Sequence, residues 1–165
     1  MGRELPQPVL EYLASQKTVT LATASADGAP HASTFMYVND GPTLYFWAKP
    51  TSTTATHLQS NPRVSFAIDE YVQDWNKAKG IQGQGHSELV SSGDEVARAV
   101  GLFADKFPSP SSGASTTNIT FFRIQPTALQ FIDNGGARTS FGDEEFGMDF
   151  HRQEVLSGSS EPTPA

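Results

Sequence analysis

Three strand-like segments joined by tight turns occupy residues 18–48. In the first segment, Val19 and Leu21 alternate with small or polar residues, which is the period-two pattern of a half-buried strand. The turn signal ADGAP leads to a second segment, His31–Val38, and NDGP leads to a third, TLYFWA. A doubly wound parallel sheet would need a helix between successive strands. The short connections therefore predict a mainly antiparallel β fold.

Further strand-like segments extend this pattern. RVSFAIDE places Val64, Phe66 and Ile68 on one face, and after a polar stretch at Tyr71–Lys79, expected to be an exposed loop, GIQGQGHSELV follows. The glycines of this segment indicate a bulge or a close approach of another backbone. NITFFRIQP and TALQFID are the last strands, and we expect a break between them at Pro126. About six strands with turn signals predict a closed or partly closed antiparallel barrel.

Two to three helices interrupt the strands. Pro8 suits the first turn of an N-terminal helix, and Ala55–Gln59 can form only a short helix because Pro62 disfavours helical geometry just before it. Ser92 and Glu95 form the pattern of a capping box at the start of a longer helix. The apolar face of that helix is expected to contain Val96, Val100, Phe103 and Phe107. Pro108 ends the helix, and PSPSSGAST is expected to be a loop.

Composition narrows the class of protein. With 165 residues, 37% of them hydrophobic, the chain suits one domain over residues 1–150, followed by a flexible tail at residues 151–165. It has no apolar run of about 18 residues and no signal-peptide pattern, so we expect a cytoplasmic protein without a membrane partner. The net charge of −7 argues against nucleic acid as a partner. Because cysteine is absent, disulfides, thiolate metal sites and a cysteine nucleophile are excluded.

Motifs for metal binding or hydrolysis are weak. His31, His57, His86 and His151 lack the spacing of metal ligands, so no metal site is expected. No G-x-S-x-G nucleophile elbow occurs. GIQGQG has the order G-x-x-G-x-G and does not open a helix, so a strand with permissive glycines is a better interpretation than a dinucleotide-binding loop.

Five hydroxyl side chains gather between TLYFWA and the short helix. They are Thr51, Ser52, Thr53, Thr54 and Thr56. Two interpretations remain open: a well-capped helix in a Thr-rich connection, or an anion site in which free helix amides, hydroxyls and Lys49 hold a phosphate. Phe46 and Trp47 add a flat apolar surface beside the same junction. A ligand with a phosphate tail and an aromatic ring system would suit these residues.

The chain resembles the pyridoxamine 5'-phosphate oxidase-like family of flavin-binding split barrels. The resemblance runs from about residue 13 to residue 150 and is carried by TLATASADGAPHASTFMYVNDGPTLYFWAKPTSTTATHLQSNPRVSFAID, KGIQGQGHSELV and FRIQPTALQFID, in this order. It implies a six-stranded antiparallel split β-barrel, a two-fold homodimer, and FMN in a cleft between the subunits. Individual motifs are short, and their order and spacing make the resemblance specific.

The resemblance also implies which residues hold the cofactor. Residues 44–49 would pass the isoalloxazine ring, a phosphate motif would fall on residues 52–54, and Gln82 would approach the flavin. The candidate cofactor-binding residues are Thr34, Phe35, Trp47, Ala48, Lys49, Ser52, Thr53, Thr54 and Gln82. No catalytic residue is identified.

The chain departs from the family pattern at two places. Thr54 stands where many members have a cationic residue, and FIDNGGARTSFGDEEF lacks the Trp-Gln-Gly and Arg-x-His arrangement that holds pyridoxamine phosphate, with Arg138 as the nearby cation. We therefore do not expect pyridoxamine phosphate oxidase activity. Two functions stay open: an FMN-dependent oxidoreductase acting on an unidentified small molecule, or a non-enzymatic binder or sensor of a flavin, haem or similar planar ligand.

Overall fold

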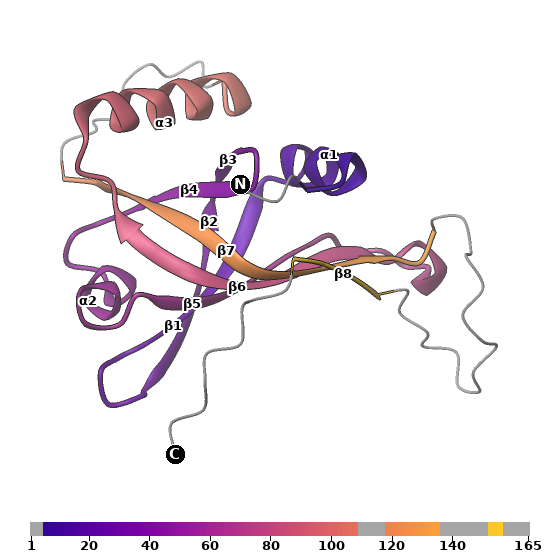
Figure 1. Cartoon of the computed structure of the whole chain (residues 1–165), viewed down its shortest axis with the longest axis horizontal. Coiled ribbons are helices and arrows are strands. Elements are labelled where there is room, and N and C mark those ends of the chain that lie inside the picture. The colour runs from indigo at the N-terminus through magenta and orange to yellow at the C-terminus, as the bar shows by residue number, and fades with distance from the viewer. Residues whose placement is uncertain (1–4, 109–117, 136–151, 157–165) are drawn as a thin grey trace.

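The computed structural model describes residues 5–108 and 118–135, and the backbone of residues 152–156. One antiparallel sheet of eight strands dominates it, with three α-helices at its margins (Figure 1). The strands are β1 (Thr18–Ala24), β2 (Pro30–Met36), β3 (Val38–Asp40), β4 (Thr43–Ala48), β5 (Arg63–Asp69), β6 (Lys79–Leu89), β7 (Thr120–Asp133) and β8 (Arg152–Leu156). The helices are α1 (Gln7–Ser15), α2 (Thr53–Ser60) and α3 (Gly93–Lys106), with one 3-10 turn, η1, at Trp75–Lys77. None of the helices in these ranges has the length and apolar character that crossing a membrane would require.

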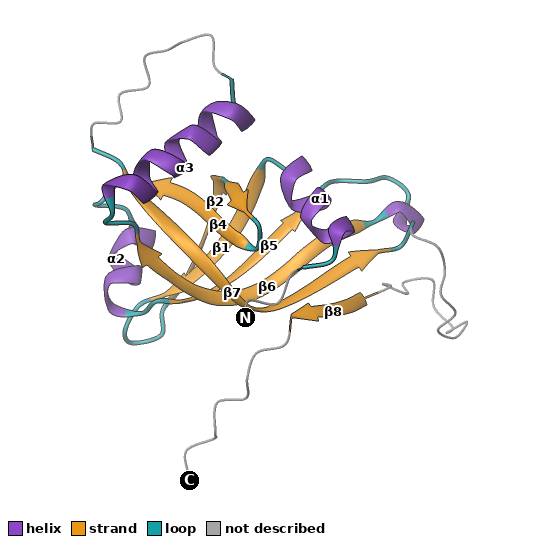
Figure 2. Ribbon diagram, turned by 45° about the horizontal axis from the view of Figure 1, so that its top comes forward, coloured by secondary structure: helices purple, strands orange, loops and turns teal. Residues whose placement is uncertain are grey.

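The sheet curls into a split barrel (Figure 2). Its strand order is β2-β1-β5-β6-β7-β4-β3, and β8 pairs with β7. Curling brings β2, at one end of this order, back beside β4, where the rings of Phe35 and Phe46 lie 4.9 Å apart. Phe46 in turn stacks on Phe122 of β7 at 5.3 Å. The expected fold class, mainly β with flanking helices, is confirmed: the predicted strand segments correspond to β1, β2 and β4–β7, with the last two segments both in β7, and β3 and β8 are short additions.

The barrel interior is filled by the apolar residues that alternate along the strands. Val19 and Leu21 of β1 and Ile68 of β5 are fully buried, as their period-two spacing predicts. Helix α1 covers one end of the barrel with Val9 and Leu13. A smaller second core lies between α3 and the strands β3, β4 and β7, and it includes the buried residues Val38, Tyr45, Ala99 and Phe121.

Strand β7 continues through Pro126, so the expected break into two strands is wrong. Gly85 pairs with Pro126 and Gln84 pairs with Ala128, which leaves Thr127 as the extra residue of a bulge. A bulge accepts proline because the ladder hydrogen bond that proline cannot donate is already interrupted there. The predicted close approach is confirmed, since a Cβ atom at Gly85 would lie 2.3 Å from the carbonyl oxygen of Gln125.

The start of α3 also differs from the prediction. Ser92 is the N-cap residue but its side chain caps no amide, so the expected capping box does not form. The Glu95 carboxylate instead accepts hydrogen bonds from the Arg123 guanidinium at 2.8 Å and from the Tyr45 hydroxyl at 3.1 Å. The guanidinium of Arg123 is ionised. Its hydrogen bond to Glu95 is therefore stronger than the bond that Glu95 could accept from the backbone amide of Ser92 in a capping box.

Smaller differences concern the faces and ends of elements. Val96, Phe103 and Phe107 pack against the second core, as expected for the apolar face of α3. Val100 departs from the prediction because it is 41% exposed, and Ala99 is buried in its place. The strand predicted at residues 31–38 is divided at Tyr37, whose hydroxyl donates to the Leu13 carbonyl at 2.6 Å. Helix α2 is longer than expected at both ends, and β8 lies within the expected C-terminal tail. The expected loop at PSPSSGAST falls almost entirely outside the described residues.

Candidate functional site

The end of β4 leads directly into α2 through a tight turn. Along β4, Phe46 and Ala48 are buried while Trp47 points to the other face and is 39% exposed. The turn is closed by the Ser52 amide, which donates to the Lys49 carbonyl at 3.0 Å. This local geometry places an exposed indole ring, a lysine and the first turn of a helix next to one another.

The clustered hydroxyls at this junction have different roles. Ser52 caps α2, because its Oγ accepts from the Ala55 amide at 3.2 Å. Thr56 Oγ1 donates back to the Ser52 carbonyl at 3.0 Å, and the Thr54 side chain is only 1% exposed. Thr51 and Thr53 are exposed, and the amides of Thr53 and Thr54 have no acceptor among the described residues. The capping interpretation is therefore confirmed for Ser52, and free helix amides remain available at the same place.

A hollow of about 350 Å³, which we call the β4–α2 hollow, opens beside this junction. It is lined by Thr34, Phe35 and Met36 of β2 and by Trp47, Ala48, Lys49, Thr51 and Ser52. Its size lies at the lower end of the range of about 300–1,000 Å³ typical of small-molecule sites. Lys49 is the charged residue among those that line it, and the positive end of the α2 dipole lies at Ser52. The hollow thus combines an aromatic wall with a region that favours an anion.

The structure brings most of the predicted cofactor residues together in this hollow. Thr34, Phe35, Trp47, Ala48, Lys49 and Ser52 all line it. Met36 and Thr51 also line the hollow and are not among the predicted cofactor-binding residues. Both were detectable: Met36 shares a strand face with Thr34, and Thr51 belongs to the hydroxyl cluster.

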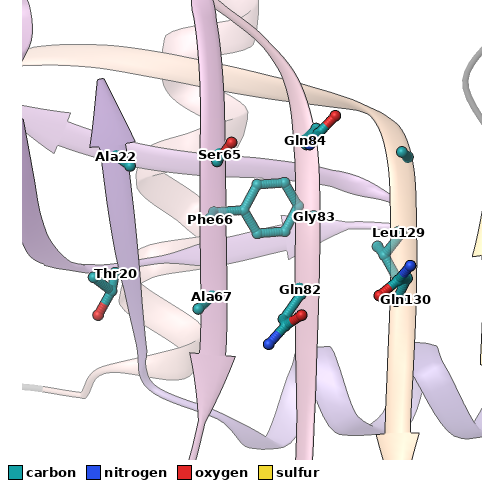
Figure 3. A pocket seen from close by; sticks show the side chains of 11 residues that line it. Thr20, Ala22, Ser65, Phe66, Ala67, Gln82, Gly83, Gln84, Leu129 and Gln130 are labelled. Atoms are coloured by element: carbon teal, nitrogen blue, oxygen red, sulfur yellow. The ribbon is translucent and has the colours of Figure 1, made fainter. Parts of the chain in front are cut away.

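Three predicted residues do not line the β4–α2 hollow. Thr53 is exposed on the first turn of α2, and Thr54 is buried against the barrel. Gln82 lies on β6 and lines a different cavity of about 550 Å³, which we call the sheet-face hollow (Figure 3). Within a single chain, the side chains of these three residues therefore do not line one hollow with Lys49, although the backbone amides of Thr53 and Thr54 lie at the start of α2.

The sheet-face hollow lies on the outer surface of β1, β5, β6 and β7. Figure 3 shows its small or amide-bearing side chains, which belong to Thr20, Ala22, Ser65, Ala67, Gln82, Gln84 and Gln130. Phe66 packs behind Gly83, where a Cβ atom would lie 2.2 Å from the ring. The lining of this hollow contains no charged residue.

The two hollows are connected by one row of paired residues that crosses the sheet. Thr34 pairs with Thr20, Thr20 with Ala67, and Ala67 with Gln82. Because neighbouring strands are about 4.8 Å apart, Thr34 and Gln82 are separated by about 14 Å along this row. The hollows meet at the first pair, where the Thr20 and Thr34 hydroxyl oxygens lie 3.3 Å apart.

Histidines that are scattered in the sequence meet near α2. The rings of His31 and His57 lie 5.9 Å apart, and each has one fixed nitrogen: Ser33 Oγ lies 2.8 Å from His31 Nε2, and Thr23 Oγ1 lies 3.1 Å from His57 Nδ1. In the part of the chain that the structure describes, no three His, Asp or Glu side chains gather as a metal site would require.

Comparison with known proteins identifies the family. The family model described as pyridoxamine 5'-phosphate oxidase matches residues 5–133. The chain belongs to the pyridoxamine 5'-phosphate oxidase family. Among curated proteins, the UPF0306 protein plu4501 of Photorhabdus laumondii is 34% identical to it over 106 residues, covering 62% of this chain and 71% of that protein.

Solved structures share the split-barrel fold of this family. HutZ, the haem storage protein of Vibrio cholerae, matches with a TM-score of 0.65 and 22% identity over 76% of this chain and 93% of that one. An FAD-binding protein of Mesorhizobium loti matches with a TM-score of 0.60 and 25% identity over 77% of this chain and 94% of that one. Thr54, which stands where many family members have a cationic residue, is buried in this structure. The departure around Arg138 lies outside the described residues.

Proposed function

We propose that this chain binds FMN in the β4–α2 hollow and that the bound flavin serves an oxidoreductase reaction on a small molecule. The observation that carries the proposal is the convergence of Trp47, Lys49 and the start of α2 on one hollow. The FAD-binding protein of Mesorhizobium loti, which has the same fold, supports a flavin as the ligand.

Each part of FMN has a suitable counterpart in the hollow. The phosphate would interact with Lys49, the Thr51 hydroxyl and the free amides of Thr53 and Thr54, because helix amides and a nearby cation favour anions. The ring system would lie against the exposed indole of Trp47 and the half-buried ring of Phe35. These residues fit the cofactor without a glycine-rich phosphate loop.

The chain itself would bind and orient the flavin and exclude water from it. A bound flavin supplies the hydride or electron transfer. The aromatic wall formed by Phe35 and Trp47 would hold the ring in one orientation, while Lys49 would anchor the opposite end of the cofactor. A substrate would then approach on the side of the ring that the protein leaves open.

Gln82 takes part in this proposal through a two-fold homodimer. A separation of about 14 Å keeps Gln82 away from the β4–α2 hollow of its own chain. A two-fold axis passing between Thr20 and Ala67 would place Gln82 of one copy opposite Thr34 of the other. The uncharged sheet-face hollow suits burial against a second copy, because the centres of protein interfaces are depleted of charge.

Titration with FMN and with riboflavin tests the phosphate part of the proposal. The two ligands share the ring system, so only FMN gains from Lys49 and the helix amides. We expect fluorescence quenching to show tighter binding of FMN, and Lys49→Met to weaken FMN more than riboflavin. Equal affinities for FMN and riboflavin would contradict the proposed phosphate site.

Complementation between two variants tests the dimer. Lys49→Met and Gln82→Ala chains would be co-expressed with different tags, and the heterodimer isolated. If each site uses both copies, one site of the heterodimer is intact and binds one FMN with wild-type affinity. If Gln82 acts within its own chain, neither site of the heterodimer is intact, and if Gln82 has no role, the Gln82→Ala homodimer already binds FMN with wild-type affinity. A monomeric mass in light scattering would contradict the dimer directly.

Turnover separates an enzyme from a non-enzymatic flavin binder. The FMN-loaded protein would be mixed with nicotinamide cofactors and then with candidate acceptors. We expect the flavin absorbance to bleach and then to return. Bound FMN that neither reductant bleaches would favour a storage or sensing role.

Met36 supports a second candidate, a haem or similar planar ligand in the same hollow. Met36 is 44% exposed and lines the hollow, and methionine sulfur is an axial ligand of haem iron in other proteins. HutZ, which has this fold, is a haem storage protein. In a haemin titration, Met36→Ala should change the Soret band if Met36 binds the iron, whereas FMN affinity should change little.

A further inference from the structure

A second groove lies on the other side of α2 from the β4–α2 hollow. We call it the α2–β6 groove; its volume is about 560 Å³, and its lining residues come from α2 and the residues around it, the end of β6 and the start of β7. Its apolar lining consists of Pro50, Ala55, Leu58, Pro62, Leu89 and Phe122. No residue lines both this groove and the β4–α2 hollow, so the two cavities are separate.

Ser87 is the one buried polar residue of this lining, because the other polar residues that line the groove, Gln59, Ser60, Glu88 and Thr120, are exposed or partly exposed. The residue is 1% exposed, and its hydroxyl has no hydrogen-bond partner among the described residues. Its backbone is held in place, because the Ser87 amide donates to the Pro62 carbonyl at 2.8 Å. A buried hydroxyl without a partner is unfavourable, since it loses the hydrogen bonds that water makes with it in the unfolded chain. The hydroxyl is therefore fixed at the groove with its hydrogen-bonding capacity unused.

Leu89, at the end of β6, is an exposed apolar residue of the same groove. Leu89 lines the groove and is 55% exposed, so the apolar lining extends to the surface there. A molecule in the groove would cover Leu89 and contact Leu58 and Phe122 at the same time. Covering this surface would supply the hydrophobic part of a binding free energy.

We propose that the α2–β6 groove is a binding site for a small, uncharged, mainly apolar molecule that carries one hydroxyl or carbonyl group, with Ser87 as its hydrogen-bond partner. A hydroxyl side chain can donate and accept, so either group suits it. The charged side chain that follows, Glu88, is bound to Arg123 at 2.6 Å and is not free to hold a cation in the groove. The site is independent of the proposed flavin and does not require it.

Benzyl alcohol and toluene form a matched pair of probes for this site. They share a ring, and only benzyl alcohol has a group for Ser87. We expect benzyl alcohol to shift the amide signals of Leu58 and Leu89 saturably in a ¹⁵N-correlated NMR titration, and to bind about 2- to 12-fold tighter than toluene, the contribution of a typical hydrogen bond. Equal affinities, or no saturable shift, would overturn the proposal.

Two serine variants identify the group that is responsible. Ser87→Ala should abolish the preference for benzyl alcohol over toluene and should leave Tm unchanged or higher, because it removes an unpartnered group. Ser65→Ala, on the outer face of the sheet, should leave the preference intact. A preference that survives Ser87→Ala, or a Tm lowered by that change, would overturn the assignment because the hydroxyl would then have another role.

The same titration in the presence of excess FMN separates this site from the proposed flavin site. Because the cavities share no lining residue, benzyl alcohol should bind equally well with and without FMN. Displacement by FMN would overturn a separate site. Failure of FMN to bind would leave the benzyl alcohol result unaffected and would count only against the flavin proposal.

Discussion

The hydroxyl oxygens of Thr20 and Thr34 lie 3.3 Å apart, at the point where the sheet-face hollow meets the β4–α2 hollow. Each threonine lines one of the two cavities. Any ligand or partner that bridges the cavities must therefore pass over this pair.

Thr34→Val and Thr20→Val should affect FMN differently. Both changes keep the side-chain shape and remove the hydroxyl, and each removes the same cross-strand contact, which typically contributes about 0.2–1 kcal/mol. Only Thr34 lines the proposed flavin site, so Thr34→Val should weaken FMN more than Thr20→Val. Fluorescence titration measures both affinities, and equal effects would contradict the placement of the ligand in the β4–α2 hollow.

Ser52→Ala should lower the free energy of unfolding by about 0.5–2 kcal/mol, the usual effect of removing an N-cap side chain. The reason is the lost bond from the Ala55 amide to Ser52 Oγ. Thr53→Ala is the control, because Thr53 is exposed and should change stability by less than about 0.5 kcal/mol. Urea denaturation measures both, and similar values for the two variants would show that Ser52 does not act as the cap.

A lysine should improve FMN binding at position 51 but not at position 54. Thr51 is exposed and lines the hollow, so Thr51→Lys adds a cation beside the proposed phosphate and should tighten FMN about tenfold relative to riboflavin, or about 1.4 kcal/mol, at low salt. Thr54 is 1% exposed, so Thr54→Lys would bury a charge and destabilise the fold. The gain at position 51 should shrink as salt rises. If Thr51→Lys showed no preference for FMN over riboflavin at low salt, this result would argue against a phosphate beside Thr51.

Stability should depend on pH through Lys106. Burial, together with the nearby charge of Lys17, lowers the pKa of Lys106 from 10.5 to about 8. The unfolded chain then binds more protons between these values, so the free energy of unfolding should rise with pH from about 8. Burial raises the pKa of Tyr12 and Tyr37 above 10.0. Above pH 10.0 the folded chain therefore binds more protons at these tyrosines than the unfolded chain, so the free energy of unfolding falls as pH rises further. Denaturant titrations should therefore show a maximum near pH 10, and Lys106→Met should remove the rise.

Two glycines should respond to alanine with opposite sign. Gly85→Ala would bring a Cβ atom to 2.3 Å from the Gln125 carbonyl oxygen at the bulge, and should cost about 1–3 kcal/mol. Gly101→Ala, inside α3 with no atom within 4 Å of the new Cβ, should stabilise the protein by about 0.4–1 kcal/mol. Thermal unfolding compares the two directly. A stable Gly85→Ala variant would show that the bulge can relax.

The sequence alone was sufficient for the features that depend on near neighbours in the chain. Period-two alternation identified the buried residues of β1 and β5. The two turn signals predicted that β1, β2 and β4 follow one another through short connections. Trp47, Lys49 and Ser52 are neighbours in sequence, so their association in the β4–α2 hollow could be predicted from the local order of residues.

Only the tertiary structure decided which distant residues meet. Glu95 pairs with Arg123 rather than with its own helix start, and the bulge beside Gly85 lets β7 continue through Pro126. Gln82 and the unpartnered Ser87 hydroxyl belong to cavities made by strands far apart in sequence. The physical reason is that alternation specifies the face on which a side chain lies, whereas the neighbours on that face are set by strand order, register and curling of the sheet, which depend on how the whole core packs.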